Sequence, residues 1–279
     1  MLEDLERSWG ITLDRPLPGG SASYVSTATT RSGTTLVVKV AVAADRLDDQ
    51  ARTLQRAAGC GYALLKEYDA DRHALLLEAL GTPLENSGRP PADQLRILAD
   101  TLRLAWQPVG DIPPAAPGAD KASGLHTLVS DLWTQLDRPC PERVVRQALH
   151  YAEALRTPEP AELVVVHGDP HPGNALAVER GRPGGETGYC FVDPDGFVAD
   201  RAYDLGVALR DWGSRLDGPD ARRTAEGFAD IRADRSGVEA TRIWQWGFLE
   251  RVSTGLYLMS FGATELGRRF LQVAERLVD

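Results

Sequence analysis

Two short apolar runs, each ending in polar residues, constrain this chain more than any other feature. Leu163–Val166 leads into His-Gly-Asp, which ends at Asp169, and Asn174 follows five residues later. A second run, Tyr189–Val192, leads into Asp193. Short apolar runs of this kind predict buried strands. The polar residues are therefore expected on two loops that a buried core holds in place.

Asp169, Asn174 and Asp193 are the polar groups that phosphoryl transfer from Mg-ATP requires. One carboxylate orients the attacking hydroxyl and accepts its proton, while an amide and a second carboxylate hold magnesium on the phosphates. Magnesium prefers oxygen ligands and keeps several waters, so one Asp and one Asn suffice. The alternative is that these residues only cap turns. Asp195 is either a further ligand or a solvated turn residue.

Two histidines, His167 and His171, accompany Asp169 in the first loop. They raise the possibility of zinc, but no third His or Cys lies at a suitable spacing. We expect His167 to pack and hydrogen-bond in support of the loop. His171 is expected to fix the loop or to face the metal site.

The first 80 residues predict strands and one helix. Strands are expected over 11–17, 21–29 and 34–40 and as a pair within 61–80, with a helix over 45–58. Lys39 lies on the third strand, where a lysine can pair with nucleotide phosphates. Because strand side chains alternate, Val37 and Lys39 share one face and Leu36 and Val38 the other.

A turn at Gly20 and Ser21 precedes the lysine strand. It is able to close over phosphates, although it is neither a GxGxxG loop nor a Walker A motif. After residue 91 the pattern becomes helical. Helices are expected over 94–105, 124–136, 143–155, 196–215 and 237–277. We place the boundary near residues 78–86, which gives a nucleotide-binding part, 1–80, and a catalytic and substrate-binding part, 81–279.

Composition narrows the function classes. The net charge is −9, from 31 basic and 40 acidic residues, which argues against nucleic acid and is compatible with a cationic small molecule. No apolar run approaches the roughly 20 residues of a membrane helix, and the acidic N-terminus is unlike a signal peptide. The odd number of cysteines, three, fits the reducing cytosol.

Several motifs resemble one kinase family. HGDPHPGN matches the HGDxHxxN signature of the aminoglycoside phosphotransferases, and FVDPDG matches their metal-binding strand. DPDGFVADRAYDL resembles the branch that contains streptomycin 6-phosphotransferases and hydroxyurea kinases, as do GGSASYV and LLLEAL. The resemblance runs from about Gly19 to the last helix, and its catalytic motifs are the specific part.

The resemblance implies an α+β, bilobal, protein-kinase-like fold that uses ATP and Mg²⁺. It makes Asp169 the catalytic base, Asn174 and Asp193 the magnesium ligands, and Lys39 the phosphate-binding lysine. Glu78 to Leu80 becomes the hinge that meets adenine.

One departure from the family concerns the partner of the lysine. The family pairs that lysine with a glutamate on the following helix, whereas this helix offers Asp45, Asp48 and Asp49. Of these we favour Asp48 or Asp49 as the partner of Lys39.

The substrate side is expected to be acidic. Asp200, Asp204, Asp211 and Glu250 are candidates for charge-assisted hydrogen bonds to guanidinium or amino groups. Trp212 is a candidate to cover a cationic ring. The alternative is that Asp204 braces the catalytic loop, the tryptophan belongs to the core, and the remaining acids are solvated.

The function expected from these features is an antibiotic O-phosphotransferase of the cytoplasm, monomeric or dimeric. Its acceptor would be a streptomycin-type aminoglycoside or a tuberactinomycin peptide such as capreomycin or viomycin. The alternatives are a kinase of choline, fructosamine or another small metabolite, and a nucleotide-binding pseudokinase.

Overall fold

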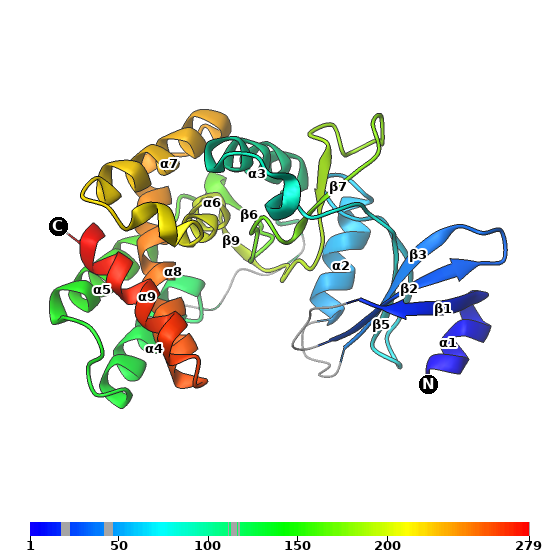
Figure 1. The fold of residues 1–279 in the computed structure, drawn as a ribbon, viewed down its shortest axis with the longest axis horizontal. Helices are drawn as coiled ribbons and strands as arrows, with labels where there is room; N and C mark the ends of the chain where they lie inside the picture. Colours follow the sequence, from blue (N-terminus) through cyan, green and yellow to red (C-terminus); the bar gives the residue numbers. More distant parts are fainter. Residues whose placement is uncertain (18–22, 42–46, 111, 113–115, 117, 279) are drawn as a thin grey trace.

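The structure, a computed structural model, describes residues 1–17, 23–41, 47–110, 112, 116 and 118–278. A five-stranded antiparallel sheet and two helices form one end of the molecule, and helices dominate the rest (Figure 1). The sheet-bearing part comprises α1 Leu2–Trp9, β1 Ile11–Pro16, β2 Ser23–Thr30, β3 Thr35–Ala41, α2 Leu47–Ala57, β4 Leu65–Asp69 and β5 Ala74–Glu78.

The remainder carries the catalytic motifs on short hairpins among helices. Its elements are the 3₁₀ helix η2 Leu84–Ser87, α3 Pro91–Ala105, α4 Lys121–Gln135, α5 Glu142–Leu155, η3 Pro160–Glu162, β6 Leu163–Val165, β7 Ala175–Ala177, β8 Tyr189–Phe191, β9 Val198–Asp200, α6 Arg201–Val207, η4 Ala208–Arg210, η5 Gly213–Leu216, α7 Ala221–Ser236, α8 Ala240–Ser260 and α9 Thr264–Leu277. Strand β6 pairs with β9, and β7 pairs with β8. None of the helices in these ranges combines the length and apolarity needed to cross a membrane.

The two faces of β3 are buried in different clusters. Leu36 and Val38 pack in a small cluster with Leu5 of α1. Val37 packs on the opposite side, against the main core, so Lys39 shares its face, as the alternation predicts. Helix α1, which covers the first face, is absent from our sequence-based prediction because eight residues carry little periodic signal.

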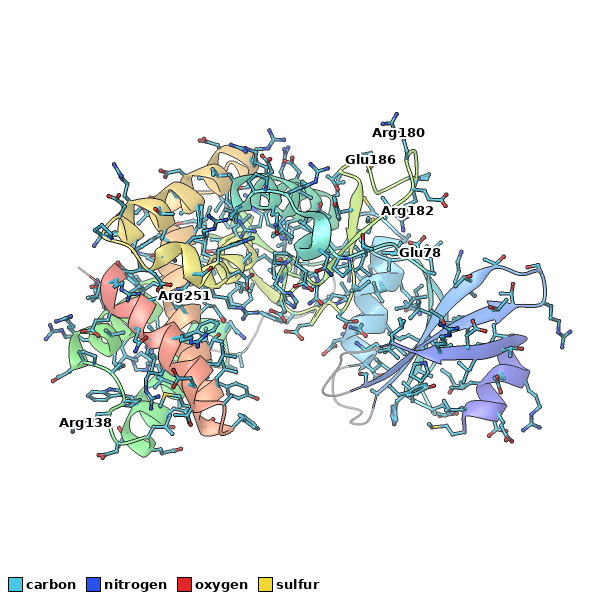
Figure 2. The ribbon with its side chains drawn as sticks, viewed as in Figure 1. Glu78, Arg138, Arg180, Arg182, Glu186 and Arg251 are labelled. Atoms are coloured by element: carbon cyan, nitrogen blue, oxygen red, sulfur yellow. The ribbon has the colours of Figure 1, made fainter. Side chains whose placement is uncertain are left out.

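The segment that follows α2 is hydrogen-bonded into the β7–β8 hairpin. Gly61 N donates to Gly184 O at 2.7 Å, and Phe191 N donates to Gly61 O at 2.8 Å. From the hairpin loop, Arg182 donates to the carbonyls of Gly59 and Tyr62 and pairs with Glu78 at the end of β5 (Figure 2). Backbone and side-chain bonds thus join the sheet-bearing part to the catalytic hairpins.

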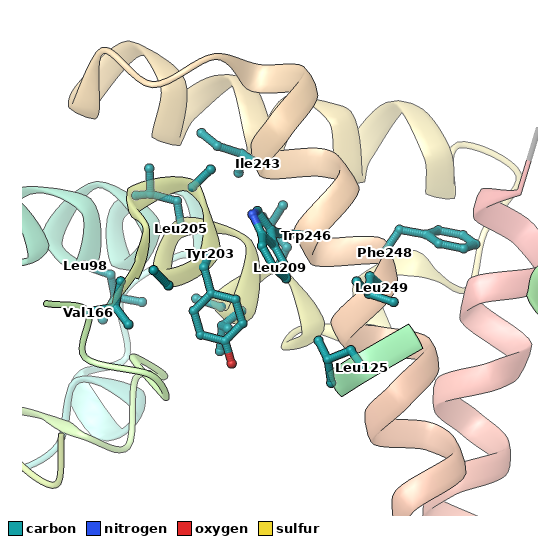
Figure 3. Packing of buried hydrophobic residues seen from close by; sticks show 14 of the residues in the cluster. Leu98, Leu125, Val166, Tyr203, Leu205, Leu209, Ile243, Trp246, Phe248 and Leu249 are labelled. Atoms are coloured by element: carbon teal, nitrogen blue, oxygen red, sulfur yellow. The ribbon is translucent and has the colours of Figure 1, made fainter. Parts of the chain in front are cut away.

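Helices α6 and α8 cross at two glycines. A Cβ on Gly206 would lie 2.4 Å from the Cβ of Trp246 and 2.8 Å from the nitrogen of Gly247. This close approach lets Tyr203 of α6 stack edge-on against Trp246, with ring centroids 5.0 Å apart, while its hydroxyl points out of the apolar cluster (Figure 3). The predicted helix over 237–277 is two helices, interrupted at Gly262, where φ is +85°.

The predicted fold class is confirmed, since an antiparallel sheet with a helix precedes a larger, mostly helical part. The boundary between residues 80 and 81 stays a prediction.

Candidate active site

The first loop, His167–Asn174, presents Asp169 to a cleft between the two parts. The cleft has a volume of about 1040 Å³, which is at the upper end of the range for small-molecule sites. The Asp169 side chain is 40% exposed. The described polar residues that line the cleft with Asp169 are Ser23, Lys39, Gln50, Lys121, His171, Asn174, Asp193, Asp195, Tyr203, Arg210, Glu250, Ser253, Thr254 and Tyr257.

Asp204 of α6 holds the beginning of this loop. Its carboxylate, 0% exposed, accepts hydrogen bonds from His167 N at 2.8 Å and Gly168 N at 2.9 Å. Trp106 Nε1 donates to the same carboxylate at 2.9 Å. Burial raises the pKa of Asp204 to about 6, although these three donors oppose the rise. The sequence-based alternative of a bracing role for Asp204 is what the structure shows.

His167 supports the loop as a neutral ring. Its Nδ1 accepts from Asp169 N at 3.1 Å, so the proton lies on Nε2, which donates to Val192 O at 2.9 Å. Burial lowers the pKa of His167 below its ordinary 6.5, against nearby carboxylates that raise it. Because Val192 precedes Asp193, this ring joins the two loops.

His171 stands on the other side of the aspartate. Its Nε2 lies 3.7 Å from Asp169 Oδ2, and its Nδ1 accepts from Gly173 N at 3.1 Å. His171 thus contacts the loop and also lines the cleft, so both of its expected roles stay predictions.

Asn174 and Asp193 offer oxygens that fit magnesium. Asn174 donates through Nδ2 to Asp169 O at 3.0 Å, which leaves its amide oxygen available to a cation. Asp193 has a φ of +57°, a backbone conformation that residues other than glycine rarely adopt. Such residues often occur at functional positions. Two hard oxygens beside a cleft wide enough for phosphates match the preference of Mg²⁺.

Lys39 forms its ion pair with Asp193, at 2.8 Å from Nζ to Oδ1. The expected pairing with Asp48 or Asp49 is not what the structure shows. Asp48 accepts a hydrogen bond from the Tyr68 hydroxyl, and Asp49 pairs with Arg52 at 2.6 Å. These aspartates therefore have other partners, and Asp45 lies outside the described residues.

Gln50 is a polar residue of α2 that lines the cleft, and the sequence-based analysis missed it. Its side chain is 6% exposed, Nε2 lies 3.5 Å from Pro194 O, and no partner is found for Oε1 among the described residues. A neutral amide between Asp49 and Ala51 carries no signal in the sequence. Only the helix orientation identifies it.

Arg210 is the second residue that the sequence-based analysis missed. Its guanidinium pairs with Asp169, and its Nη1 lies 3.4 Å from Glu250 Oε2. Burial lowers the pKa of this guanidinium, but the carboxylates of Asp169, Glu250 and Asp211 outweigh it and raise that pKa. A cation therefore stays fixed beside Asp169.

Most of the residues expected on the substrate side do not line the cleft. Asp200 caps α6 through Ala202 N at 2.9 Å and pairs with Arg242 at 2.6 Å. Asp211 is half-buried, and desolvation raises its pKa. Trp212 is half-buried too and packs on Phe228 with ring centroids 6.1 Å apart. Asp200 and Trp212 thus have partners within the protein, and none of these three side chains is among the described residues that line the cleft.

Glu250 is the member of the predicted substrate group that lines the cleft. Lys121, with Nζ 3.9 Å from Glu250 Oε1, lies there too. The Glu250 carboxylate is thus paired with two cationic side chains of this protein, Arg210 and Lys121.

The expected nucleotide contacts fall partly outside the cleft as described. Glu78 accepts from Leu64 N at 2.7 Å and pairs with Arg182, so its side chain has partners within the protein. Leu80 is half-buried, and neither Glu78 nor Leu80 lines the cleft. Gly20 and Ser21 lie outside the described residues.

Comparisons with known proteins agree with this geometry. A profile of the family described as aminoglycoside/hydroxyurea antibiotic resistance kinase matches residues 8–260. The chain is 25% identical to streptomycin 6-kinase of Streptomyces glaucescens over 287 residues, which cover 99% of this chain and 88% of that protein.

Solved structures share the fold. Choline kinase LicA of Streptococcus pneumoniae is similar with a TM-score of 0.63 at 15% identity, over 99% of this chain and 97% of that one. Macrolide 2'-phosphotransferase MphH of Brachybacterium faecium is similar with a TM-score of 0.61 at 16% identity, over 97% and 96%. These similarities confirm the predicted kinase-like architecture.

Proposed function

Because this chain belongs to the aminoglycoside/hydroxyurea antibiotic resistance kinase family, we propose that it inactivates a cationic antibiotic by transferring the γ-phosphoryl group of ATP to one of its hydroxyls. The chain is a phosphotransferase with an alcohol acceptor, as its family and its kinase relatives are. The observation that carries the proposal is the convergence of Lys39, Asp169, Asn174 and Asp193 on one cleft.

Each of these residues has a proposed part in the reaction. Asp169 orients the acceptor hydroxyl and accepts its proton. The amide oxygen of Asn174 and the carboxylate of Asp193 would hold Mg²⁺, which neutralises charge on the phosphates when it is bound. Lys39 lies beside Asp193 and is therefore near those phosphates.

The remaining nucleotide contacts belong to the same proposal. The backbone at Glu78 to Leu80 would meet adenine, because this segment follows β5 and leads into the helical part. The residues Gly20 and Ser21, which lie outside the described part of the chain, would cover the phosphates, a role that rests on the sequence motif alone.

A streptomycin-type aminoglycoside is the acceptor that we propose. The support is the relative from Streptomyces glaucescens, whose similarity covers 99% of this chain. Tuberactinomycin peptides such as capreomycin and viomycin are also cationic, so they belong in the test. The similarity to choline kinase extends to the fold alone and does not favour a metabolite kinase.

The test is a coupled ADP-release assay with Mg-ATP against streptomycin, a 2-deoxystreptamine aminoglycoside, capreomycin, viomycin, hydroxyurea and choline. Asp169→Ala serves as the matched control. Acceptor-dependent turnover with streptomycin that the control lacks would support the proposal. Turnover with capreomycin or viomycin alone would change the proposed acceptor to a tuberactinomycin peptide, and turnover with choline alone would overturn the antibiotic assignment. Absence of turnover with every acceptor, while Mg-ATP still binds, would indicate a regulatory protein.

A further inference from the structure

A chain of polar contacts runs from α8 through Arg210 to the catalytic aspartate. We propose that Arg210 is a positioning residue for Asp169, anchored on the buried carboxylate of Glu250. The inference rests on the proposed function, because it takes Asp169 as the group that orients the acceptor hydroxyl. It also gives Glu250 a role other than contact with the antibiotic.

Glu250 is a fixed anchor. Its side chain is 5% exposed, and its Oε1 accepts from the Tyr203 hydroxyl at 3.0 Å. Tyr203 is itself wedged between Phe197 and Trp246, with ring centroids 5.5 and 5.0 Å away. A carboxylate with a locked donor and little access to water cannot change its position readily.

The two carboxylates that Arg210 contacts differ in burial. The side chain of Glu250 is 5% exposed, whereas that of Asp169 is 40% exposed. If the guanidinium left Glu250, a buried carboxylate would lose its strongest cationic partner, which is strongly unfavourable. Breaking the contact with half-exposed Asp169 costs less free energy, because water can solvate that carboxylate. Glu250 therefore fixes the position of Arg210, and Arg210 in turn fixes the position of Asp169.

The guanidinium binds the two carboxylates through different nitrogens. Nη1 faces Glu250 Oε2, and Nη2 donates to Asp169 Oδ1. This leaves Asp169 Oδ2, which lies 3.7 Å from His171 Nε2, as the oxygen for the acceptor. A half-exposed aspartate without such a partner would sample other rotamers, and those misplace the oxygen.

The reaction assigned to this oxygen is balanced. The acceptor oxygen forms a bond to the γ-phosphorus, the bond from that phosphorus to the leaving ADP oxygen breaks, and the hydroxyl proton passes to Asp169 Oδ2. Arg210 stays protonated throughout, because the neighbouring carboxylates raise its pKa. It therefore orients the base and takes no proton.

The experiment compares Arg210→Met and Arg210→Lys with the wild-type chain. Arg210→Met is expected to lower kcat about 100-fold, the effect of a misplacement of about 1 Å, with KM for Mg-ATP and acceptor within about threefold. Arg210→Lys keeps the charge but has one nitrogen for two carboxylates, so we expect about a tenfold loss. The background Asp169→Ala provides the specific readout, since removal of Arg210 there should change nothing further.

Three results would overturn the proposal. They are a wild-type kcat in Arg210→Met, an equal loss in the Asp169→Ala background, and an effect confined to KM. If Arg210→Met does not fold, as judged by circular dichroism, a wild-type kcat in Arg210→Lys overturns it equally. The wild-type rate on the antibiotic panel tests the proposed function separately. The variant-to-wild-type ratio is also measured on acceptor-free hydrolysis of Mg-ATP, so it does not depend on the antibiotic.

Discussion

Replacing Asp204 by asparagine should leave stability at neutral pH almost unchanged while damaging catalysis. The carboxylate is fully buried and accepts from His167 N and Trp106 Nε1 through Oδ2, and from Gly168 N through Oδ1. An asparagine whose oxygen takes the Oδ2 position keeps two of these bonds. Its NH₂ group then faces the N–H of Gly168, which is left without an acceptor.

Two opposing free energies set the expected stability of Asp204→Asn. Burial raises the pKa from 3.8 to about 6, so at about 1.4 kcal/mol per pH unit the ionised carboxylate costs about 3 kcal/mol at pH 7. The neutral amide removes this cost. The unpaired N–H of Gly168 costs about 1–3 kcal/mol. The two nearly cancel at pH 7, whereas below pH 4 only the second remains.

The sign of the pH dependence follows from the raised pKa. The contribution of Asp204 is fully present below pH 3.8 and is lost as the pH rises through about 6. Between pH 4.5 and 7 the variant should therefore gain about 2 kcal/mol relative to the wild-type chain. Titration of His167 occurs in both proteins and cancels in the difference.

The assay is urea unfolding of both proteins at several pH values, followed by tryptophan fluorescence, together with kcat at pH 7.5. We expect kcat of Asp204→Asn to fall about tenfold or more, since a loop that carries the base moves when Gly168 loses its acceptor. A difference in unfolding free energy that stays flat across the pH range would refute the reasoning. A decrease of more than about 4 kcal/mol in the unfolding free energy of Asp204→Asn at pH 7 would also refute it.

Three other predictions concern the base, the histidine and a helix crossing. Asp169→Ala should lower kcat by about 10²–10⁴-fold and leave the calorimetric affinity for Mg-ATP within about threefold; near-normal turnover would remove the base assignment. Burial lowers the pKa of His167 from 6.5. Below pH 6.5 the histidine is therefore protonated in the unfolded chain before it is protonated in the native one, so the free energy of unfolding should fall as the pH drops. Urea unfolding of His167→Gln should lack this slope, and an unchanged slope would point to another group. Gly206→Ala places a Cβ 2.4 Å from that of Trp246, which should cost about 1–3 kcal/mol in urea unfolding; wild-type stability would show that the crossing relaxes.

The catalytic loops could be predicted from sequence because local features determine them. Each loop follows a short apolar strand, so the local sequence is enough to place Asp169, Asn174 and Asp193 on loops, whereas the exact position of the first loop also depends on Asp204 of α6. The orientation of Lys39 follows from strand alternation in the same way.

The acceptor side could not be predicted, because its charges are paired by distant residues. Asp200 pairs with Arg242, which lies 42 residues away in the sequence, and Arg210 pairs with Asp169, which lies 41 residues away. A sequence shows that acids are present but does not show which of them the core buries. Gln50 was missed for the related reason that its role depends on which side of α2 faces the cleft.

The bonds between residues 59–63 and the β7–β8 hairpin have a consequence for unfolding. Two lobes joined only by a hinge can melt in separate steps, but these two share backbone hydrogen bonds at Gly61 and Phe191 and the side chain of Arg182. Opening either lobe removes partners from the other. The lobes should therefore melt in a single cooperative transition, and a chain cut at residue 80 would leave two fragments that each need the other to fold.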